Sequence, residues 1–176
     1  MQFSNVYLLG IGGIGMSALA RYFHAAGKRV SGYDKTPTPL TDELIKEGIA
    51  VTFNDDIKEL PNALINGDAS DFLIIYTPAI PKDHKQYNHF LAQHMKMQKR
   101  SVVLGWITKQ VFTIAVAGTH GKTTTSCMIT HLLKNAGINV TAFLGGISVN
   151  YNSNLILGDV NAKDAVVVVE ADEFDR

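Results

Sequence analysis

The sequence predicts an α/β fold with parallel sheets, and two observations lead to that prediction. Apolar segments of strand length alternate with amphipathic segments of helix length along the 176 residues. Glycine-rich turns at residues 10–15 and 118–121 each follow an apolar strand and open a helix. Turns of this kind point backbone N–H groups at phosphate oxygens. We therefore expect a Rossmann-like parallel-sheet domain, followed by the first part of a P-loop α/β domain.

The first turn has the pattern Gly-Ile-Gly-Gly-Ile-Gly and lies between a strand at residues 3–9 and a helix at 16–26. The next strand, 28–33, ends at Asp34, about twenty residues beyond the turn, where an acidic side chain can bind a ribose diol. The pattern indicates a diphosphate but not which ligand carries it. Two other interpretations stay open: the glycines only allow helix and strand to pack closely, and Asp34 only caps a turn.

Further along, residues 41–47 are predicted as a helix with Thr41 as its N-cap, and residues 49–53 and 71–77 as strands. The loop after the last of these strands lies on the ligand side of a parallel sheet, so it either lines the ligand site or is a rigid connection. Its candidate contacts are Thr77, Ala79 and Ile80.

Three histidines, His84, His89 and His94, recur every five residues. That spacing spreads them around a helix, so we expect surface side chains and no metal cluster.

The chain becomes basic and then helical over residues 99–110, which we interpret as a linker. It separates a first domain at 1–98 from a second at 111–176. An apolar strand at 111–117 opens the second domain.

The second turn lies in the run Ala-Val-Ala-Gly-Thr-His-Gly-Lys-Thr-Thr-Thr at residues 115–125. In such a run Lys122 can neutralise charge on the β- and γ-phosphates, and the Thr123 hydroxyl can ligate Mg²⁺. Val116 stands where a standard P-loop has its first glycine, which argues against a simple kinase or GTPase. His120 either contacts the nucleotide or is a tolerated loop residue. A glycine turn with a chance Lys-Thr pair is the alternative to the whole assignment.

Residues 139–144 and 165–169 are predicted as two further strands, with a loop at 145–154 between them. The second strand leads into Glu170, and an acid at the tip of an apolar strand beside a P-loop is a usual second anchor for Mg²⁺. Asp172 and Glu173 compete for that role. A cluster of acids that is merely solvated is the alternative.

The composition fits a nucleotide-binding protein of the cytoplasm. Sixteen basic residues balance sixteen acidic ones, so no overall field attracts nucleic acid or an anionic membrane. The single cysteine, Cys127, excludes an internal disulfide and is expected to pack inside a helix rather than to react. No apolar run is long enough for a membrane span, and the amino terminus carries no signal-peptide pattern.

Taken together, the Gly-Ile-Gly-Gly-Ile-Gly-Met-Ser loop, the Ala-Gly-Thr-His-Gly-Lys-Thr-Thr-Thr run and the Glu-Ala-Asp-Glu box resemble the ATP-dependent Mur ligases of peptidoglycan synthesis. The resemblance covers essentially the whole chain. It implies that the first domain binds the UDP part of UDP-N-acetylmuramic acid through Gly12, Gly13, Ile14, Gly15, Met16, Ser17, Asp34, Thr77, Ala79 and Ile80. It implies ATP binding by Gly118, Thr119, His120, Gly121, Lys122, Thr123 and Thr124, with Thr123 and Glu170 on Mg²⁺ and with Lys122 and Glu170 as the catalytic groups.

The resemblance also implies a reaction. The lactyl carboxylate of the sugar nucleotide would attack the γ-phosphate of ATP, and an amine would then displace phosphate from the acyl phosphate. The motifs are most similar to members that use L-alanine, and a relative that attaches a recycled tripeptide is the alternative. An NAD(P)-dependent dehydrogenase and a non-catalytic nucleotide-binding module also stay open. Because family members have three domains, we expect these residues to be a truncated piece that does not ligate by itself.

Overall fold

The computed structural model describes residues 3–159, 162 and 164–171. The chain divides into two compact units, Met1–Val103 and Leu104–Arg176. Helix α5 (Arg100–Thr108) crosses the division, so most of the segment interpreted as a linker is helical. Each unit has its own sheet and its own core.

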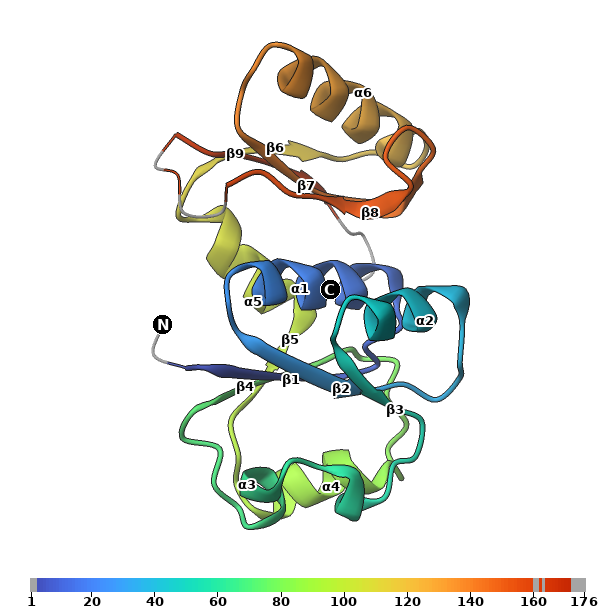
Figure 1. Cartoon of the computed structure of the whole chain (residues 1–176), viewed down its shortest axis with the longest axis vertical. Coiled ribbons are helices and arrows are strands. Elements are labelled where there is room, and N and C mark those ends of the chain that lie inside the picture. The colour runs from blue at the N-terminus through green and yellow to red at the C-terminus, as the bar shows by residue number, and fades with distance from the viewer. Residues whose placement is uncertain (1–2, 160–161, 163, 172–176) are drawn as a thin grey trace. The chain divides into compact units, whose positions relative to one another are not determined.

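The first unit is built on a five-stranded, fully parallel sheet with the strand order β3-β2-β1-β4-β5. Helices α1 (Ile14–Ala25) and α2 (Pro39–Lys46) cover one face, and α3 (Asn62–Ile65) and α4 (Lys85–Ala92) cover the other (Figure 1). This arrangement confirms the predicted Rossmann-like domain and brings the carboxyl ends of all five strands to one edge. The remaining elements are β1 (Asn5–Leu9), β2 (Arg29–Tyr33), β3 (Ala50–Thr52), β4 (Phe72–Tyr76), β5 (Met97–Lys99) and the 3₁₀ helix η1 (Ile57–Glu59).

The central strands are apolar throughout because both faces of this sheet are covered. On the face of α4, Tyr7, Ile74 and Phe90 belong to one buried cluster. The Tyr7 hydroxyl donates a 2.9 Å hydrogen bond to Oε1 of Gln86, a residue that is fully buried. Burial raises the pKa of Tyr7. A buried polar pair thus connects β1 to α4.

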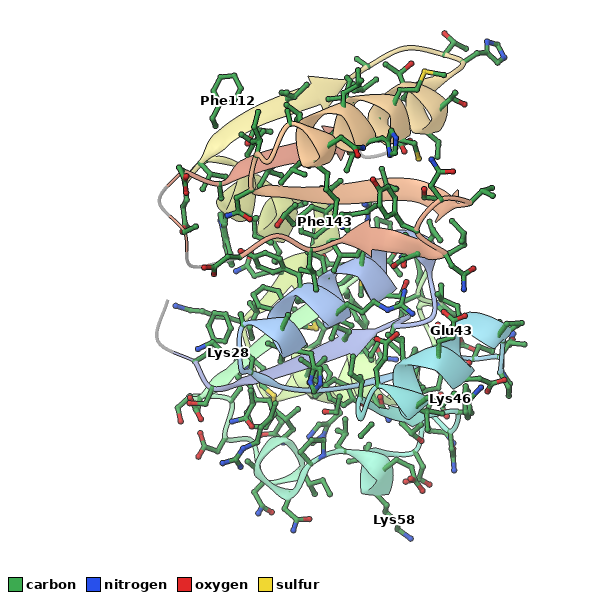
Figure 2. The ribbon with its side chains drawn as sticks, turned by 45° about the horizontal axis from the view of Figure 1, so that its top comes forward. Lys28, Glu43, Lys46, Lys58, Phe112 and Phe143 are labelled. Atoms are coloured by element: carbon green, nitrogen blue, oxygen red, sulfur yellow. The ribbon has the colours of Figure 1, made fainter. Side chains whose placement is uncertain are left out.

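On the other face, Arg21 fastens α1 to α2. Its guanidinium lies 3.0 Å from a carboxylate oxygen of Glu43 and 2.8 Å from one of Glu47. Glu43 lies in α2 and Glu47 is the C-cap of that helix, and because they are four residues apart they lie on the same side of it. Figure 2 shows Glu43 and, on the same helix, Lys46.

The prediction that Thr41 caps α2 is wrong. The N-cap is Thr38, whose hydroxyl accepts a hydrogen bond from the Thr41 backbone N–H, while the Thr41 hydroxyl accepts one from the Thr38 N–H. This reciprocal pair is a capping box, and Pro39 suits the first helical position because it has no N–H to satisfy. The helix therefore begins earlier than the apolar pattern suggests.

The prediction of a surface position is also wrong for His84, which is only 4% exposed. Its Nδ1 accepts a 3.2 Å hydrogen bond from the Tyr87 N–H and so caps α4. Its ring packs edge-to-face on Tyr33, with the centroids 4.5 Å apart. Burial lowers the pKa of His84. Spacing alone could not reveal a capping role.

The second unit contains a four-stranded sheet with the order β6-β9-β7-β8, and helix α6 (Lys122–Asn135) lies on a face of it (Figure 1). Strands β6, β9 and β7 are parallel, and β8 is antiparallel to β7. Cys127 packs against the core of this unit, as predicted. The strands are β6 (Phe112–Val116), β7 (Val140–Ser148), β8 (Ser153–Ile156) and β9 (Val166–Glu170).

The prediction of a loop at residues 145–154 is wrong for most of that segment. Strand β7 continues to Ser148 and pairs with β8 in a hairpin. Its register with β8 shifts between Phe143 and Ser148, so the two glycines inside this stretch lie in an irregular part of the ladder. Glycine in a strand often marks such an irregularity.

In the described part of the chain, no helix has both the length and the apolar character for a membrane span.

Candidate functional site

The first glycine loop joins β1 to α1 at the carboxyl edge of its sheet. The strand order reverses between β1 and β4, and ligands of doubly wound sheets bind at that point. The loop is fixed to β2, because the N–H groups of Gly10 and Ile11 donate to the Tyr33 carbonyl at 2.8 and 2.9 Å. Gly13 is the N-cap of α1, and no described side chain caps this end. Backbone N–H groups at such an end favour an anion.

Asp34 holds the loop from the end of β2. Its Oδ2 accepts a 2.7 Å hydrogen bond from the Gly12 N–H, and its Oδ1 accepts one of 3.2 Å from the Thr36 N–H. The carboxylate therefore shapes the glycine loop and the turn that follows β2.

Three glycines of this loop lie where a side chain would collide with a neighbour. A Cβ added to Gly10 would lie 2.9 Å from Cγ2 of Thr77, and one added to Gly12 would lie 2.7 Å from Cγ2 of Thr41. A Cβ on Gly15 would lie 2.8 Å from Nη1 of Arg100. The glycine loop is therefore packed against α2 and against the loop that follows β4, and the Arg100 guanidinium lies at its end.

Gly13 is different, because it is exposed and its added Cβ would be no closer than 3.4 Å to any neighbour. Of the other candidates, Met16 and Ser17 are 2% and 0% exposed. The Ser17 hydroxyl donates to the Ile14 carbonyl at 3.0 Å. These two side chains belong to the core, so they can offer a ligand only their backbone.

The loop after β4 lies beside the first glycine loop, since Thr77 and Ile80 are the side chains nearest to a Cβ on Gly10. It is closed by a 3.2 Å hydrogen bond from the Ile80 N–H to the Thr77 carbonyl. Ala79 is exposed at its tip. The candidates that the sequence places on this loop thus share one edge of the sheet with Asp34.

The second glycine loop connects β6 to α6, and residues 117–121 are all exposed. Gly118 has φ +139° and Gly121, the N-cap of α6, has φ +77°, which are backbone conformations that favour glycine. The Lys122 Nζ donates a 2.6 Å hydrogen bond to the Gly118 carbonyl, so the lysine folds back over the loop. The first turn of α6 has no acidic residue. The loop therefore offers backbone N–H groups and a positive charge, which suits phosphate.

Glu170 ends β9 and reaches the start of α6. Its Oε2 accepts a 3.1 Å hydrogen bond from the Thr123 hydroxyl, and its Oε1 accepts one of 2.7 Å from the Gly145 N–H. The two oxygen ligands expected for Mg²⁺ are thus adjacent. The competing candidates Asp172 and Glu173 lie outside the described residues.

Two residues at these sites escape sequence reasoning. Arg100 lies in a basic stretch that reads as linker, yet its side chain contacts the first glycine loop. Gly145 lies in a segment that the sequence predicts as a loop, yet its N–H donates a hydrogen bond to Glu170. The basic pair Lys99-Arg100 at the start of α5 was a signal for Arg100, and the Gly-Gly pair directly after an apolar strand was a signal for Gly145.

Comparison with known proteins gives matches along nearly the whole chain. The model described as "Mur ligase family, catalytic domain" matches residues 5–112, and the model described as "Mur ligase middle domain" matches residues 116–174. A UDP-N-acetylmuramate–L-alanine ligase of Porphyromonas gingivalis is 57% identical over 172 residues, and one of Flavobacterium psychrophilum is 57% identical over 175. These matches cover 98% and 99% of this chain but only 37% and 38% of the relatives.

Solved structures agree with this grouping. A UDP-N-acetylmuramate-alanine ligase of Thermotoga maritima has a TM-score of 0.80 at 29% identity, covering 94% of this chain and 37% of that one. A UDP-N-acetylmuramate:L-alanyl-gamma-D-glutamyl-meso-diaminopimelate ligase of Neisseria meningitides has a TM-score of 0.84 at 27% identity, covering 98% and 54%.

Proposed function

The chain belongs to the Mur ligase family, and on that premise we propose that it supplies the sugar-nucleotide-binding and ATP-binding parts of an enzyme that joins L-alanine to UDP-N-acetylmuramic acid. The observation that carries the proposal is the meeting of Thr123 and Glu170. They are 47 residues apart in the sequence, and their side-chain oxygens lie 3.1 Å apart beside an exposed, glycine-rich phosphate loop.

The first unit would bind the UDP part of the sugar nucleotide. Its diphosphate would approach the exposed Gly13 and the start of α1, with the Arg100 guanidinium nearby to offset charge. Asp34 and the loop from Thr77 to Ile80 would line the same edge of the sheet. A dehydrogenase explains this unit equally well but leaves Lys122, Thr123 and Glu170 without a purpose.

The second unit would bind ATP through residues 118–124. Mg²⁺ commonly takes one or two protein oxygens and leaves its other positions to phosphate and water, which fits Thr123 and Glu170. When bound, the ion would supply positive charge that offsets the charge on the phosphates of ATP. Lys122 would exchange its bond to the Gly118 carbonyl for a phosphate oxygen.

The reaction needs no nucleophilic side chain. The lactyl carboxylate attacks the γ-phosphorus of ATP, ADP leaves, and the resulting acyl phosphate loses phosphate when the amine of L-alanine attacks its carbonyl. The contribution of this chain is position and electrostatics: it holds the two phosphate-bearing substrates and neutralises the transferring group. The proposal places the enzyme in the cytoplasm.

The identity of the amine rests on the relatives. Those with 57% identity are L-alanine ligases, whereas the structure from Neisseria meningitides, at 27% identity, is a ligase for a tripeptide. L-Alanine is therefore the favoured substrate.

Titration calorimetry on the 176-residue chain tests the proposal. We expect binding of UDP-N-acetylmuramic acid and none of NADH. Gly13→Val should remove that binding, because its exposed side chain would cover the start of α1 without a clash. Gly27→Asn is the matched control at the opposite end of α1, where φ is +76° and asparagine is tolerated. Binding of NADH, or full sugar-nucleotide binding by Gly13→Val, would contradict the assignment of the first unit.

A further inference from the structure

The carboxylate of Glu170 is held at both oxygens, and only one of the two partners is a recognised phosphate-loop residue. Thr123 donates to Oε2 at 3.1 Å, and the backbone N–H of Gly145 donates to Oε1 at 2.7 Å. The second bond is short and charge-assisted, which makes it the stronger restraint on the carboxylate. The orientation of Glu170 therefore depends on β7 as well as on α6.

The N–H of Gly145 is available because β7 is irregular at this point. Its parallel ladder with β9 pairs Phe143 with Val169, the residue before Glu170, and its antiparallel ladder with β8 loses register between Phe143 and Ser148. An irregularity of this kind redirects backbone groups away from the ladder. Here it directs one at the acid that ends the neighbouring strand.

Glycine at position 145 is required by the carboxylate and not by the backbone. The φ angle of Gly145 lies outside the left-handed range, so any residue can adopt it. A Cβ at Gly145 would, however, lie 2.6 Å from Oε2 of Glu170. The adjacent Gly146 is a natural comparison, because its Cβ would lie 3.4 Å from Cγ2 of Thr123, an ordinary contact.

From these contacts we infer that Gly145 is a positioning residue for magnesium: its N–H and its missing side chain keep the Glu170 carboxylate against Thr123, ready to share the ion. The inference rests on the proposed function, because it deepens the assignment of Thr123 and Glu170 as magnesium ligands. Gly145 touches neither nucleotide nor metal in this account. It acts through Glu170.

The decisive measurement is the affinity of the 176-residue chain for ATP with and without Mg²⁺, in the wild type and in Gly145→Ala and Gly146→Ala. We expect Gly145→Ala to lower the Mg²⁺-dependent gain in affinity about tenfold or more, and Gly146→Ala to leave it within about twofold, as one lost charge-assisted bond predicts. The double variant Gly145→Ala/Glu170→Asp should recover part of the gain, because the shorter acid withdraws from the new methyl group. Additive losses in the double variant would overturn the inference.

A second readout needs no ligand. In a proton–nitrogen NMR spectrum, the Gly145 amide proton should lie downfield and move upfield in Glu170→Ala, while the sugar-nucleotide affinity and the melting temperature of Gly145→Ala stay near wild type. If the chemical shift of the Gly145 amide proton does not change in Glu170→Ala, the positioning role is refuted even if Mg²⁺ and ATP bind. A wild-type chain whose ATP affinity does not respond to Mg²⁺, with the amide still coupled to Glu170, would instead refute the proposed function and its magnesium site together.

Discussion

In the turn between β1 and α1, Gly10, Gly12 and Gly15 lie where a side chain would collide, whereas in the loop between β6 and α6 the glycines have no close neighbour. A Cβ on Gly12 would be within 2.8 Å of Asp34 and Thr41, but one on Gly121 would meet nothing within 4 Å. The backbone shows the opposite contrast at these two positions: Gly121 has φ +77°, and the φ angle of Gly12 is not in the left-handed range, although Gly10 at the start of the first loop has φ +84°.

This difference separates two ways to build a phosphate loop. The first loop takes its shape from neighbours, since Asp34 and the Tyr33 carbonyl fix its N–H groups. The second takes its shape from glycine conformations and from Lys122, the first residue of the adjoining helix α6. Changes in the first should therefore appear in folding stability, and changes in the second mainly in ligand affinity.

The largest effect is expected from Gly12→Val. The added side chain collides with Asp34 and Thr41, and overpacking of this kind costs about 3 kcal/mol. Urea unfolding of the chain measures the loss. Gly13→Val is the control, since its surroundings leave room for a side chain. Equal stability of the two variants would break the comparison, because it would mean that the first loop is as adaptable as the second.

The next effect is expected from Lys122→Ala and concerns affinity. The variant would lack the charge-assisted hydrogen bond from Lys122 to phosphate. Such a bond is worth about 1.5–3 kcal/mol, or roughly a 10- to 150-fold loss in ATP affinity. The unfolding free energy of the Lys122→Ala variant should differ from that of the wild type by only about 0.5 kcal/mol, because residues 117–121 beside Lys122 are exposed. Calorimetry with Mg²⁺-ATP and urea unfolding give the two numbers. A large loss of stability would show that the second loop also depends on its lysine for shape.

A smaller effect is expected from Gly121→Ala. With no neighbour near the added Cβ, the cost comes from the left-handed backbone alone, about 1 kcal/mol, and Gly121→Asn should cost less because asparagine tolerates that conformation. Urea unfolding compares them. At Gly12 the same change to asparagine should bring no relief, because the obstacle there is a collision. A penalty at Gly121 that asparagine does not reduce would contradict the distinction between the two loops.

The alternation of apolar strands and helices was enough to predict the parallel sheet of the first unit, because both faces of its central strands are covered and these strands are apolar. The prediction of a parallel sheet is wrong for one strand of the second unit, since β8 pairs antiparallel with β7 in a hairpin. The positions of Asp34 and Glu170 followed from their places at strand ends. What the sequence could not provide depends on contacts between distant residues. The register shift in β7 gives Gly145 its role, and the packing of Arg100 on Gly15 is visible only after folding.

The capping errors have a similar origin. Thr38 and Thr41 are both plausible N-caps, and the choice depends on a reciprocal bond between them that spacing does not distinguish. The sequence shows His84 as one of three equally spaced histidines, but His84 is the N-cap of α4 and its ring packs edge-to-face on Tyr33. Its burial leads to the last and smallest of the predicted effects.

The first unit should lose stability as the pH falls below about 6.5, the ordinary pKa of histidine. Burial lowers the pKa of His84 in the folded chain, while nearby Asp55 and Asp83 partly oppose that shift. At a pH between the lowered pKa of folded His84 and the ordinary pKa, the unfolded chain binds more protons than the folded chain. The unfolding free energy therefore rises with pH across this window, and the stability is lost as the pH falls through it. Asp55, whose pKa is lowered from 3.8 by a backbone hydrogen bond from Lys85, acts in the same direction at more acid pH.

Urea unfolding between pH 7.5 and 5 would measure how steeply the unfolding free energy depends on pH in the wild type and in His84→Asn, which keeps an acceptor for the Tyr87 N–H. We expect a weaker slope in the variant and no comparable change in His131→Asn, since His131 is exposed in the second unit. Equal slopes in the wild type and His84→Asn would mean that His84 takes up its proton as easily in the folded chain as in the unfolded one, and the sensitivity of the first unit would have to come from another group.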